Sequence, residues 1–346
     1  MLFELTNSLI NYTPEQQKDV VRAVTNLLIG LEEGNLLLQS ELIVIEHFSD
    51  KISDERAKQA LKYLERTIMS QQYEELTYKI RVVLGDPKYG ELRYDFFKYT
   101  TSIQKTNLLC ENQNDCEFYL KIARERYYEY NIAANEVSGG GNTTATELKK
   151  KLSKQEITLA IIDSDKHYSS AQLGATAGQC KAKYGDVKRT NCRLKILPTF
   201  EVENLIPLGF VVRHCHENHK GADFICKLKN TNLLKILRYY DYKLGATMDS
   251  CLVDDKYMSY VGEIYQQLYP RQNFENYIKT LKRQKRQDIL PAFNKDMLTI
   301  YLKCKAINNH NYDYNYDALD TNTKYREDIC KLVLHYCCVR GIASIY

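Results

Sequence analysis

The sequence predicts an α/β protein with a parallel sheet as its core, flanked by an N-terminal helical region and a mostly helical C-terminal region. Between residues 106 and 206, short apolar runs alternate with segments of helical periodicity, as in a parallel sheet with covering helices. One run, "LAII" at 159–162, is entirely apolar, which is expected of a central strand covered on both faces.

The region 1–103 is predicted to be helical. Its first helix is expected to have Thr13 as N-cap and Pro14 in the first position, followed by apolar residues at three-and-four spacing. A second helix is expected from Ser53 to about Gly85, where "GDPKYG" indicates a turn. The region contains no cluster of catalytic residue types, so we expect it to serve packing or oligomerisation, including assembly of a homo-oligomer.

The regions 104–212 and 213–346 are predicted to be the sheet domain and a mixed, mainly helical domain. In the first, the expected elements are strand 106–110, helix 114–130, strand 131–137, helix 143–152, strand 157–162 and strand 193–199. In the second, helices are expected at about 231–240, 256–268, 275–287 and 326–339, with a long polar loop at 307–325.

Composition indicates a globular protein of the cytoplasm. Of the 346 residues, 44% are hydrophobic and 27% charged, and no 18-residue uncharged apolar stretch exists that would span a membrane. The start of the chain carries Glu4 and only a short apolar stretch, which argues against a signal peptide. The 11 cysteines include no CxxC pair and fit reduced thiols. A net charge of +4 is too small to identify a nucleic-acid-binding protein by itself.

Acidic residues follow three of the predicted strands. They are Glu111 after "NLLC", Asp163 and Asp165 after "LAII", and Glu201 and Glu203 after "RLKILPT". Ligands of an open parallel sheet gather beyond the carboxyl ends of its strands, so neighbouring strands would bring these carboxylates close together. Unneutralised carboxylates raise one another's pKa, and a hard divalent cation such as Mg²⁺ or Mn²⁺ would remove that repulsion. Two such ions about 4 Å apart activate water and stabilise the leaving oxygen of a phosphodiester.

The aspartate pair also occurs in other kinds of site. An EF-hand is a poor fit, because Tyr168 and Gly174 occupy its sixth and twelfth positions. Nucleotide-sugar transferases also end a strand in D-x-D, but that reading leaves the glutamates on the flanking strands without a purpose. The glycine run 139–141 precedes a predicted helix, so it is either an anion site at a helix start or a plain strand-to-helix turn.

Four segments together resemble the TOPRIM fold. They are "LLCENQNDCEFY", "SGGGNTTATELKKKL", "LAIIDSDK" and "LPTFEVENLI", and they cover about residues 105–210. The most similar version is that of nucleases of the overcoming-lysogenisation-defect type and related bacterial anti-phage defence proteins. The resemblance implies a TOPRIM-like catalytic domain, a metal-dependent nuclease activity, a defence context and a separate ATPase subunit as partner, since no Walker motif is present.

The resemblance also implies residue roles. Glu111 corresponds to the first-strand acid and Asp115 to the aspartate that follows it in the family motif. Asp163 and Asp165 correspond to the aspartate pair, and Glu203 to the acid of an "EN" segment. These residues, with Glu201, form the candidate metal set, and Lys166 after the aspartate pair could contact the scissile phosphate or offset local acidity.

Two basic runs are candidates for nucleic-acid binding, although such runs are usually solvated surfaces. Their cations are Lys181, Lys183, Lys188, Arg189 and Arg193 in the first run, and Lys282, Arg283, Lys285 and Arg286 in the second. A histidine cluster, His214, His216 and His219, is an alternative metal site, though a structural role is favoured because a second ligand pair is missing. Lys243 could stabilise a transition state, since some relatives place a lysine after the aspartate pair; a strand-to-turn role is favoured.

The leading hypothesis is therefore a Mg²⁺- or Mn²⁺-dependent endonuclease, a hydrolase acting on DNA or RNA in antiviral defence. The alternative is a non-catalytic TOPRIM-like subunit for assembly or nucleic-acid sensing. Asn112 supports the alternative, because it stands where the family commonly has glycine. A nucleotide-sugar transferase is the third hypothesis.

Overall fold

The computed structural model describes residues 1–67, 76–215, 219–304 and 314–339. The chain divides into two compact units, each built from several segments. The first unit comprises residues 1–161, 179–195 and 329–346, and the second unit comprises residues 162–178 and 196–328. Each unit draws on more than one of the three predicted regions, and each is described by itself below.

The N-terminal region of the first unit contains a parallel sheet, so the expectation of a purely helical region was wrong. Its elements are β1 (Leu2–Leu5), α1 (Pro14–Glu32), β2 (Leu37–Ser40), α2 (Leu42–Ser49), α3 (Glu55–Thr67), β3 (Ile80–Val83) and β4 (Glu91–Arg93). The strands pair in parallel in the order β2-β1-β3-β4. Three of these strands have four residues and one has three, and runs this short show no periodicity that separates a strand from a helix.

Of the two helices expected in this region, the first is present as predicted and the second only in part. Helix α1 begins at Pro14 after Thr13, as predicted, and it buries Val20, Val24 and Leu27 on one face. The helix expected from Ser53 to Gly85 is present as α3 over Glu55–Thr67, its part at 68–75 lies outside the described residues, and it was wrong beyond them, because "IRVV" is strand β3. Isoleucine and valine are stiff at the first side-chain torsion and favour a pleated strand over a helix.

A second parallel sheet, in the order β6-β5-β7-β8, confirms the predicted α/β class. Its elements are β5 (Asn107–Cys110), α4 (Gln113–Arg126), β6 (Asn135–Ser138), α5 (Thr144–Ser153), β7 (Thr158–Ile162), α6 (Ala175–Tyr184) and β8 (Cys192–Ile196). Strand β7 is internal and all five of its residues are buried, as predicted for a central strand. Strand β5 pairs in parallel with both β6 and β7.

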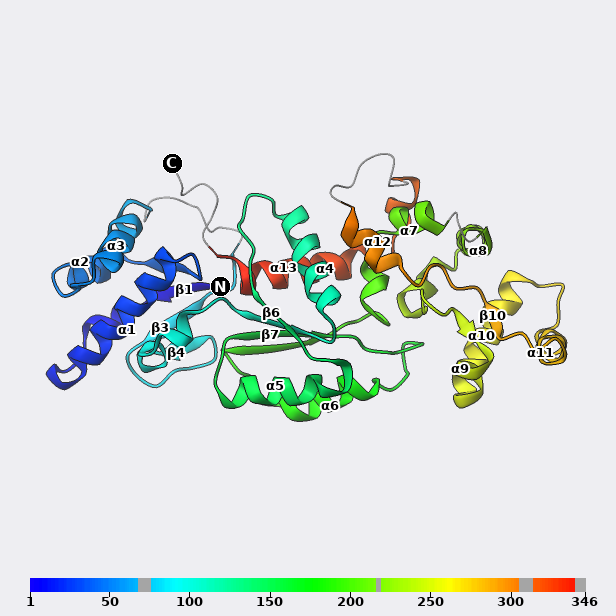
Figure 1. Ribbon diagram of the computed structural model, residues 1–346, viewed down its shortest axis with the longest axis horizontal. Coiled ribbons are helices and arrows are strands. Elements are labelled where there is room, and N and C mark those ends of the chain that lie inside the picture. Colours follow the sequence, from blue (N-terminus) through cyan, green and yellow to red (C-terminus); the bar gives the residue numbers. More distant parts are fainter. Residues whose placement is uncertain (68–75, 216–218, 305–313, 340–346) are drawn as a thin grey trace. The chain divides into compact units, whose positions relative to one another are not determined.

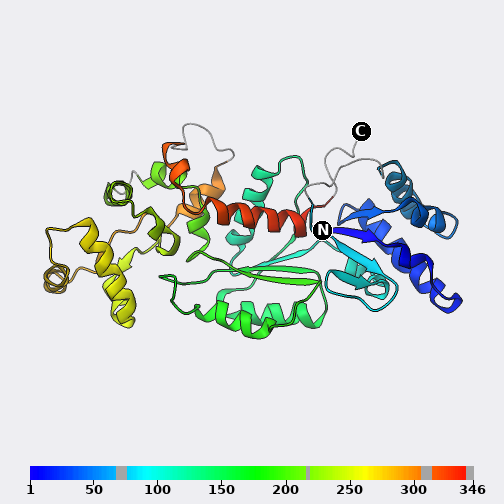
Figure 2. The same cartoon turned by 180° about the vertical axis from the view of Figure 1, so that it is seen from behind.

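Helices cover both faces of this sheet within the first unit. Figure 1 shows α5 and the later part of α6 on one face, and α4 with the Ile329–Cys337 part of α13 (Thr323–Cys337) on the other; Figure 2 agrees from behind. Leu148 of α5 and Phe118 of α4 are fully buried. Because both faces are covered, the strands can be apolar throughout, as the sequence of β7 required.

The second unit is mainly helical, as expected of the C-terminal region. Its further elements are α7 (Leu208–His214), α8 (His219–Asn230), β9 (Ala246–Thr247), α9 (Met248–Val253), α10 (Asp255–Leu268), α11 (Phe274–Arg283), β10 (Asp288–Leu290) and α12 (Met297–Lys303). Its described residues also form 3-10 helices at Val202–Leu205, Leu234–Tyr239 and Tyr314–Leu319. The long polar loop predicted at 307–325 falls partly outside the described residues, and its described part forms the last 3-10 helix and the start of α13.

Across the described part of the chain, no helix is long and apolar enough to cross a membrane. All 11 cysteines are free thiols, as their spacing predicted.

Candidate acidic site

The loop after β7 is fastened to the segment that leads into the glutamates. The backbone N–H groups of Ser164 and Asp165 both donate to the Phe200 carbonyl, at 3.2 and 3.0 Å. The Ser164 hydroxyl donates to the Thr199 carbonyl at 2.5 Å. These three hydrogen bonds within the second unit hold Ser164 and Asp165 against Thr199 and Phe200, directly before Glu201.

Asp165 has an uncommon backbone conformation and a tightly fitted side chain. Its φ of +52° lies in the left-handed region, which aspartate tolerates better than most residues. A Cβ added at Gly174 would lie 2.1 Å from the Asp165 Oδ2, so the absence of a side chain at Gly174 makes room for this carboxylate. Asp165 is exposed, yet desolvation by the surrounding residues raises its pKa, and the charges of His167 and Lys243 oppose that rise.

Glu201 and Glu203 are held by a short 3-10 helix that begins after Glu201. The Glu201 backbone N–H donates to the Asn204 side-chain oxygen at 2.8 Å, while the Asn204 amide donates to the carbonyls of Leu237 and Tyr240 at 2.7 and 2.8 Å. Asn204 is fully buried, so the "FEVEN" turn is fixed to the following 3-10 helix. The side chains of Glu201 and Glu203 are 10% and 2% exposed.

A lysine neutralises one of the two charges of this glutamate pair. The Lys243 Nζ lies 2.8 Å from the Glu201 Oε2 and 2.9 Å from the Glu203 Oε1. Burial, and then the charge of Glu203, raises the pKa of Glu201 although Lys243 opposes the rise. The two carboxylates raise the pKa of Lys243 despite its own burial, so the lysine stays charged. Two carboxylates and one ammonium leave one excess negative charge, which a proton or a bound cation would neutralise.

The remaining oxygens of the pair are suited to a hard cation. The Glu201 Oε1 and the Glu203 Oε2 are buried and, among the described residues, accept no hydrogen bond. Buried carboxylate oxygens normally have partners, and Mg²⁺ and Mn²⁺ bind such oxygens. The donor chemistry therefore fits. Over the described ranges, however, no three His, Cys, Asp or Glu side chains converge closely enough to form a metal-binding group as they stand.

Asp241 and His167 belong to the same cluster and were missed by the sequence reasoning. The Asp241 Oδ1 accepts the N–H groups of Lys243 and Leu244, at 2.8 and 2.7 Å, and so shapes the turn that presents Lys243. The charge of Asp241 also contributes to the raised pKa values of Asp165 and Glu201. In the sequence, the short spacing between Asp241 and Lys243 in "YDYK" was the one pattern that could have indicated the role of Asp241.

His167 lies in an aromatic sandwich beside the aspartates. Its ring centroid is 4.7 Å from that of Phe200 and 4.4 Å from that of Tyr257, both nearly parallel to it. Burial lowers the pKa of His167, while the charges of Asp241 and Asp165 oppose that change. Its Nδ1 is buried without a hydrogen-bond partner among the described residues. A neutral imidazole in this position can accept a proton or ligate a cation.

The first unit holds Glu111, Asp115 and the glycine run. Glu111 directly follows β5, and burial followed by the charge of Glu111 raises the pKa of Cys180 to about 11. The N–H groups of Gly139 and Gly140 donate to the carbonyls of Cys110 and Glu111, at 2.7 and 2.9 Å. These amides are therefore engaged in a strand-to-helix turn, which favours the plain-turn interpretation over an anion site.

Asp115 caps the start of α4. Its Oδ2 accepts the backbone N–H of Asn112 at 3.0 Å, and Asp115 is 5% exposed. Helix-capping carboxylates of this kind typically stabilise a fold by about 1 kcal/mol.

Replacing Asp115 by alanine is expected to lower the free energy of unfolding by about 1 kcal/mol, because the Asn112 N–H loses its acceptor. Asp115→Asn keeps an oxygen acceptor and is expected to stay within about 0.5 kcal/mol of the wild type. Urea denaturation followed by circular dichroism measures both. Equal losses in the two variants would show that the negative charge, and not the cap, is what matters at this position.

The other predicted site residues are distributed over both units. Lys166 in the second unit directs its Nζ to the Ser169 carbonyl at 3.4 Å. The first basic run lies in the first unit, where Lys188 and Arg189 pack over the rings of Tyr89 and Tyr184. The second run lies in the second unit, at the end of α11 and just beyond it.

The alternative histidine site is only partly described. His214 stacks on Phe210 with ring centroids 4.0 Å apart, and one of its ring nitrogens hydrogen-bonds the Phe210 carbonyl. His216 lies outside the described residues, as does the side chain of His219. The contacts of His214 fit the structural role that was favoured for it.

Together, these features define an α/β protein with a buried acidic cluster and a bound lysine in its second unit. No family model matches the chain, and neither the curated proteins nor the solved structures compared with it give a match.

Proposed function

We propose that this protein is a metal-dependent nuclease that hydrolyses phosphodiester bonds of DNA or RNA. The observation that carries the proposal is the glutamate pair: two nearly buried carboxylates, each with one oxygen lacking a hydrogen-bond partner among the described residues, and one negative charge in excess of Lys243. Such a pair favours a cation, and the neighbouring Asp165 supplies a further oxygen donor.

In the proposed reaction, each of these residues has its own role. Within the second unit, Glu201, Glu203 and Asp165, with Asp163 as a predicted member, would hold Mg²⁺ or Mn²⁺. When bound, such an ion polarises a phosphate and lowers the pKa of water. Lys243 is 39% exposed, so its ammonium can contact a phosphate while it offsets the glutamates. His167, whose pKa is lowered by burial, would accept a proton.

The wider setting of the proposal comes from the TOPRIM resemblance. The resemblance implies that the protein is a cytoplasmic anti-phage defence effector that works with a separate ATPase subunit.

A digestion panel tests the activity. Purified full-length protein, alone and with a candidate ATPase, is incubated with transfer RNA, single-stranded DNA and duplex DNA in Mg²⁺, Mn²⁺ or EDTA. We expect metal-dependent degradation that is lost in Asp163→Ala and in Glu203→Gln. The exposed acid Asp249, replaced by asparagine, is the control and should retain full activity. Cleavage that persists in EDTA, or that survives both substitutions, would rule out the proposed mechanism.

A second candidate is a non-catalytic subunit that assembles with, or senses, nucleic acid. It is favoured by the ion pair itself, because Lys243 already neutralises one carboxylate and no three donors converge among the described residues. The same panel separates the two, since this candidate predicts oligonucleotide binding without cleavage in either metal. A thermal shift with nucleotide sugars but none with oligonucleotides would instead favour the transferase.

A further inference from the structure

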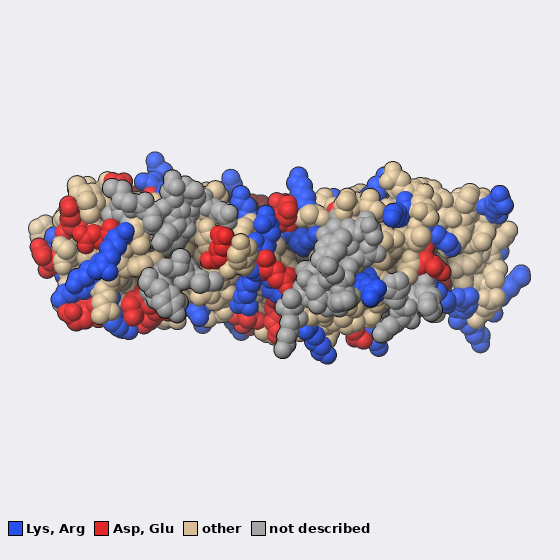
Figure 3. All heavy atoms as spheres, turned by 90° about the horizontal axis from the view of Figure 1, so that it is seen from above, with Lys and Arg blue, Asp and Glu red and all other residues tan. Residues whose placement is uncertain are grey.

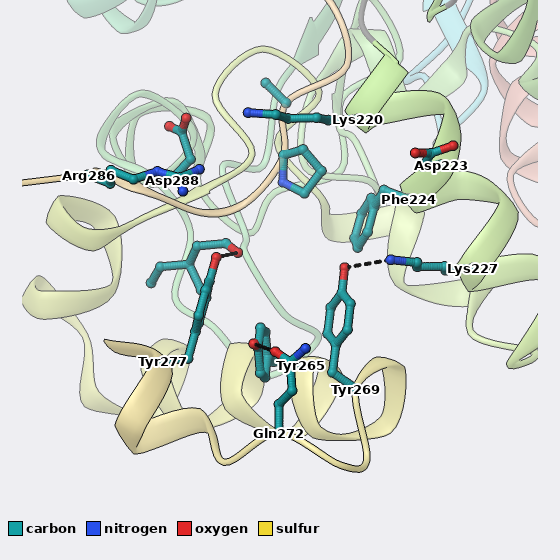
Figure 4. Close-up of a pocket in the computed structure, with 13 residues that line it drawn as sticks. Lys220, Asp223, Phe224, Lys227, Tyr265, Tyr269, Gln272, Tyr277, Arg286 and Asp288 are labelled. Carbon is teal, nitrogen blue, oxygen red and sulfur yellow. Dashed lines mark hydrogen bonds between the residues drawn. The ribbon is translucent and has the colours of Figure 1, made fainter. Parts of the chain in front are cut away.

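The second unit contains a cavity of about 460 Å³, a size typical of small-ligand sites. It is formed by α8, α10, α11 and β10 (Figure 4). None of the residues of the acidic cluster lines it. The lining includes Lys220, Lys227, Arg286, Tyr265, Tyr269 and Tyr277.

One wall of the cavity is aromatic. The rings of Tyr265 and Tyr277 stack with centroids 4.5 Å apart, and those of Tyr265 and Tyr269 lie 4.8 Å apart. Tyr265 is buried behind the other two, whereas Tyr269 and Tyr277 are partly exposed. Lys227 lies 4.5 Å above the Tyr269 ring and donates to its hydroxyl at 3.2 Å, which fixes the orientation of that ring. The cavity therefore presents a pre-oriented flat surface.

The opposite side is cationic. Figure 4 shows Lys220 and Arg286 across the opening from the tyrosines. Within the described part of the chain, neither of them nor Lys227 forms an ion pair within 4.0 Å. Asp223 and Asp288 also line the cavity, so the site carries a net charge of +1 and offers two hydrogen-bond acceptors. In Figure 3, blue side chains predominate over the part of the second unit that carries α10 and α11.

We propose that this cavity binds one nucleotide unit, with the base stacked on Tyr269 or Tyr277 and the phosphate between Lys220 and Arg286. Flat aromatic surfaces accept every base, and unpaired cations beside them accept the phosphate. The two aspartates can accept hydrogen bonds from base amino groups or sugar hydroxyls. The unit is either a free nucleotide or one residue of a single strand, because both offer the same base and phosphate.

The test measures binding without catalysis. Fluorescein-labelled short oligonucleotides of thymidine and of uridine are titrated with full-length protein in EDTA and followed by fluorescence anisotropy, with AMP as competitor. Labelled ATP is titrated in parallel. We expect binding of at least one of these probes. Displacement by AMP, or binding of ATP, assigns the site to a free nucleotide; oligonucleotide binding that AMP does not displace assigns it to a strand.

Variants locate the binding in the cavity. Arg286→Ala and Tyr269→Leu are each expected to weaken it about fivefold or more. Lys220→Ala is expected to weaken the salt dependence of oligonucleotide binding. The slope of log K against log salt should become less steep by about 0.7, the value for one phosphate contact of a single strand. Lys279→Ala, an exposed lysine of α11 outside the cavity, and Tyr99→Leu, an exposed tyrosine of the first unit, should bind as the wild type does. Circular dichroism confirms that each variant is folded.

Two results would overturn the proposal: no binding of any probe, or equal binding by wild type and the cavity variants. Asp249→Asn, an exposed acid of the second unit outside both the cavity and the acidic cluster, is included and should retain full binding. Since EDTA is present throughout, the outcome is independent of whether the acidic cluster cleaves nucleic acid.

Discussion

Replacing Gly245 by alanine is expected to destabilise the second unit by about 3 kcal/mol or more. A Cβ at this position would lie 2.4 Å from the Leu290 carbonyl oxygen and 2.7 Å from the Ala292 nitrogen. Both are backbone atoms, so the clash cannot be relieved by turning a side chain. Gly245 also has a φ of +69°, which adds strain for any residue with a side chain. Overpacking and a left-handed backbone each typically cost about 1–3 kcal/mol.

Urea denaturation followed by tyrosine fluorescence measures this effect, since the chain has 28 tyrosines and no tryptophan. Gly178→Ala is the matched control. Nothing lies within 4 Å of its added Cβ, and Gly178 lies within α6, where alanine is the better helix former by about 1 kcal/mol. A Gly245→Ala protein as stable as the wild type would show that β10 and the turn before β9 do not approach as closely as described.

Replacing Lys243 by methionine is expected to lower the free energy of unfolding by about 2 kcal/mol at neutral pH. The substitution leaves Glu201 and Glu203 buried without their cation. Removing one partner of a fully buried pair typically costs about 3–5 kcal/mol, and the smaller value here reflects the 39% exposure of Lys243.

The loss depends on pH in a defined direction. The pKa of Glu201 is raised in the folded protein, so its protonated form favours folding. That contribution is present below the unfolded pKa and is lost as the pH rises through the raised folded pKa. Without Lys243 the pKa rises further, so the gap between variant and wild type should be larger at about pH 9 than at about pH 5.

Urea denaturation at both pH values measures this gap. The double variant Glu201→Gln with Lys243→Met removes the unpaired charge together with its partner and is expected to recover much of the loss. Lys295→Met, an exposed lysine of the second unit, serves as control. A loss that is the same at both pH values would show that the methylene chain of Lys243, and not its charge, supports this site.

The same ion pair offsets part of the charge of the acidic cluster in the second unit. Lys243 satisfies one oxygen of each glutamate and leaves the other oxygen of each without a hydrogen-bond partner among the described residues. The aspartate pair was predicted to need a cation for neutralisation. For the glutamates beside it, Lys243 supplies one positive charge. One negative charge remains, and the proposed nuclease would use it to bind a metal ion.

Local patterns were enough to predict several elements of the sheet. The strands "NLLC" and "TLAII" and the helices between them follow from apolar runs and helical spacing, which act over a few residues. The N-terminal sheet could not be predicted in this way. Strand β1 is stabilised by pairing with β2 and β3, and β3 lies more than 70 residues farther along the chain. Pairing over such a distance leaves no periodic signal in a run of four residues.

The sequence by itself determined the α/β class, the buried strand β7 and the position of two aspartates at its end, because burial and periodicity are properties of short segments. Only the tertiary structure decided which cation meets the glutamates, since Glu201 and Lys243 are 42 residues apart and are joined through the turn made by Asp241. It likewise assembled the tyrosines and lysines of the cavity from three separate helices, α8, α10 and α11. Ion pairs and ring stacks depend on distances in space, and the order of residues along a chain does not contain those distances.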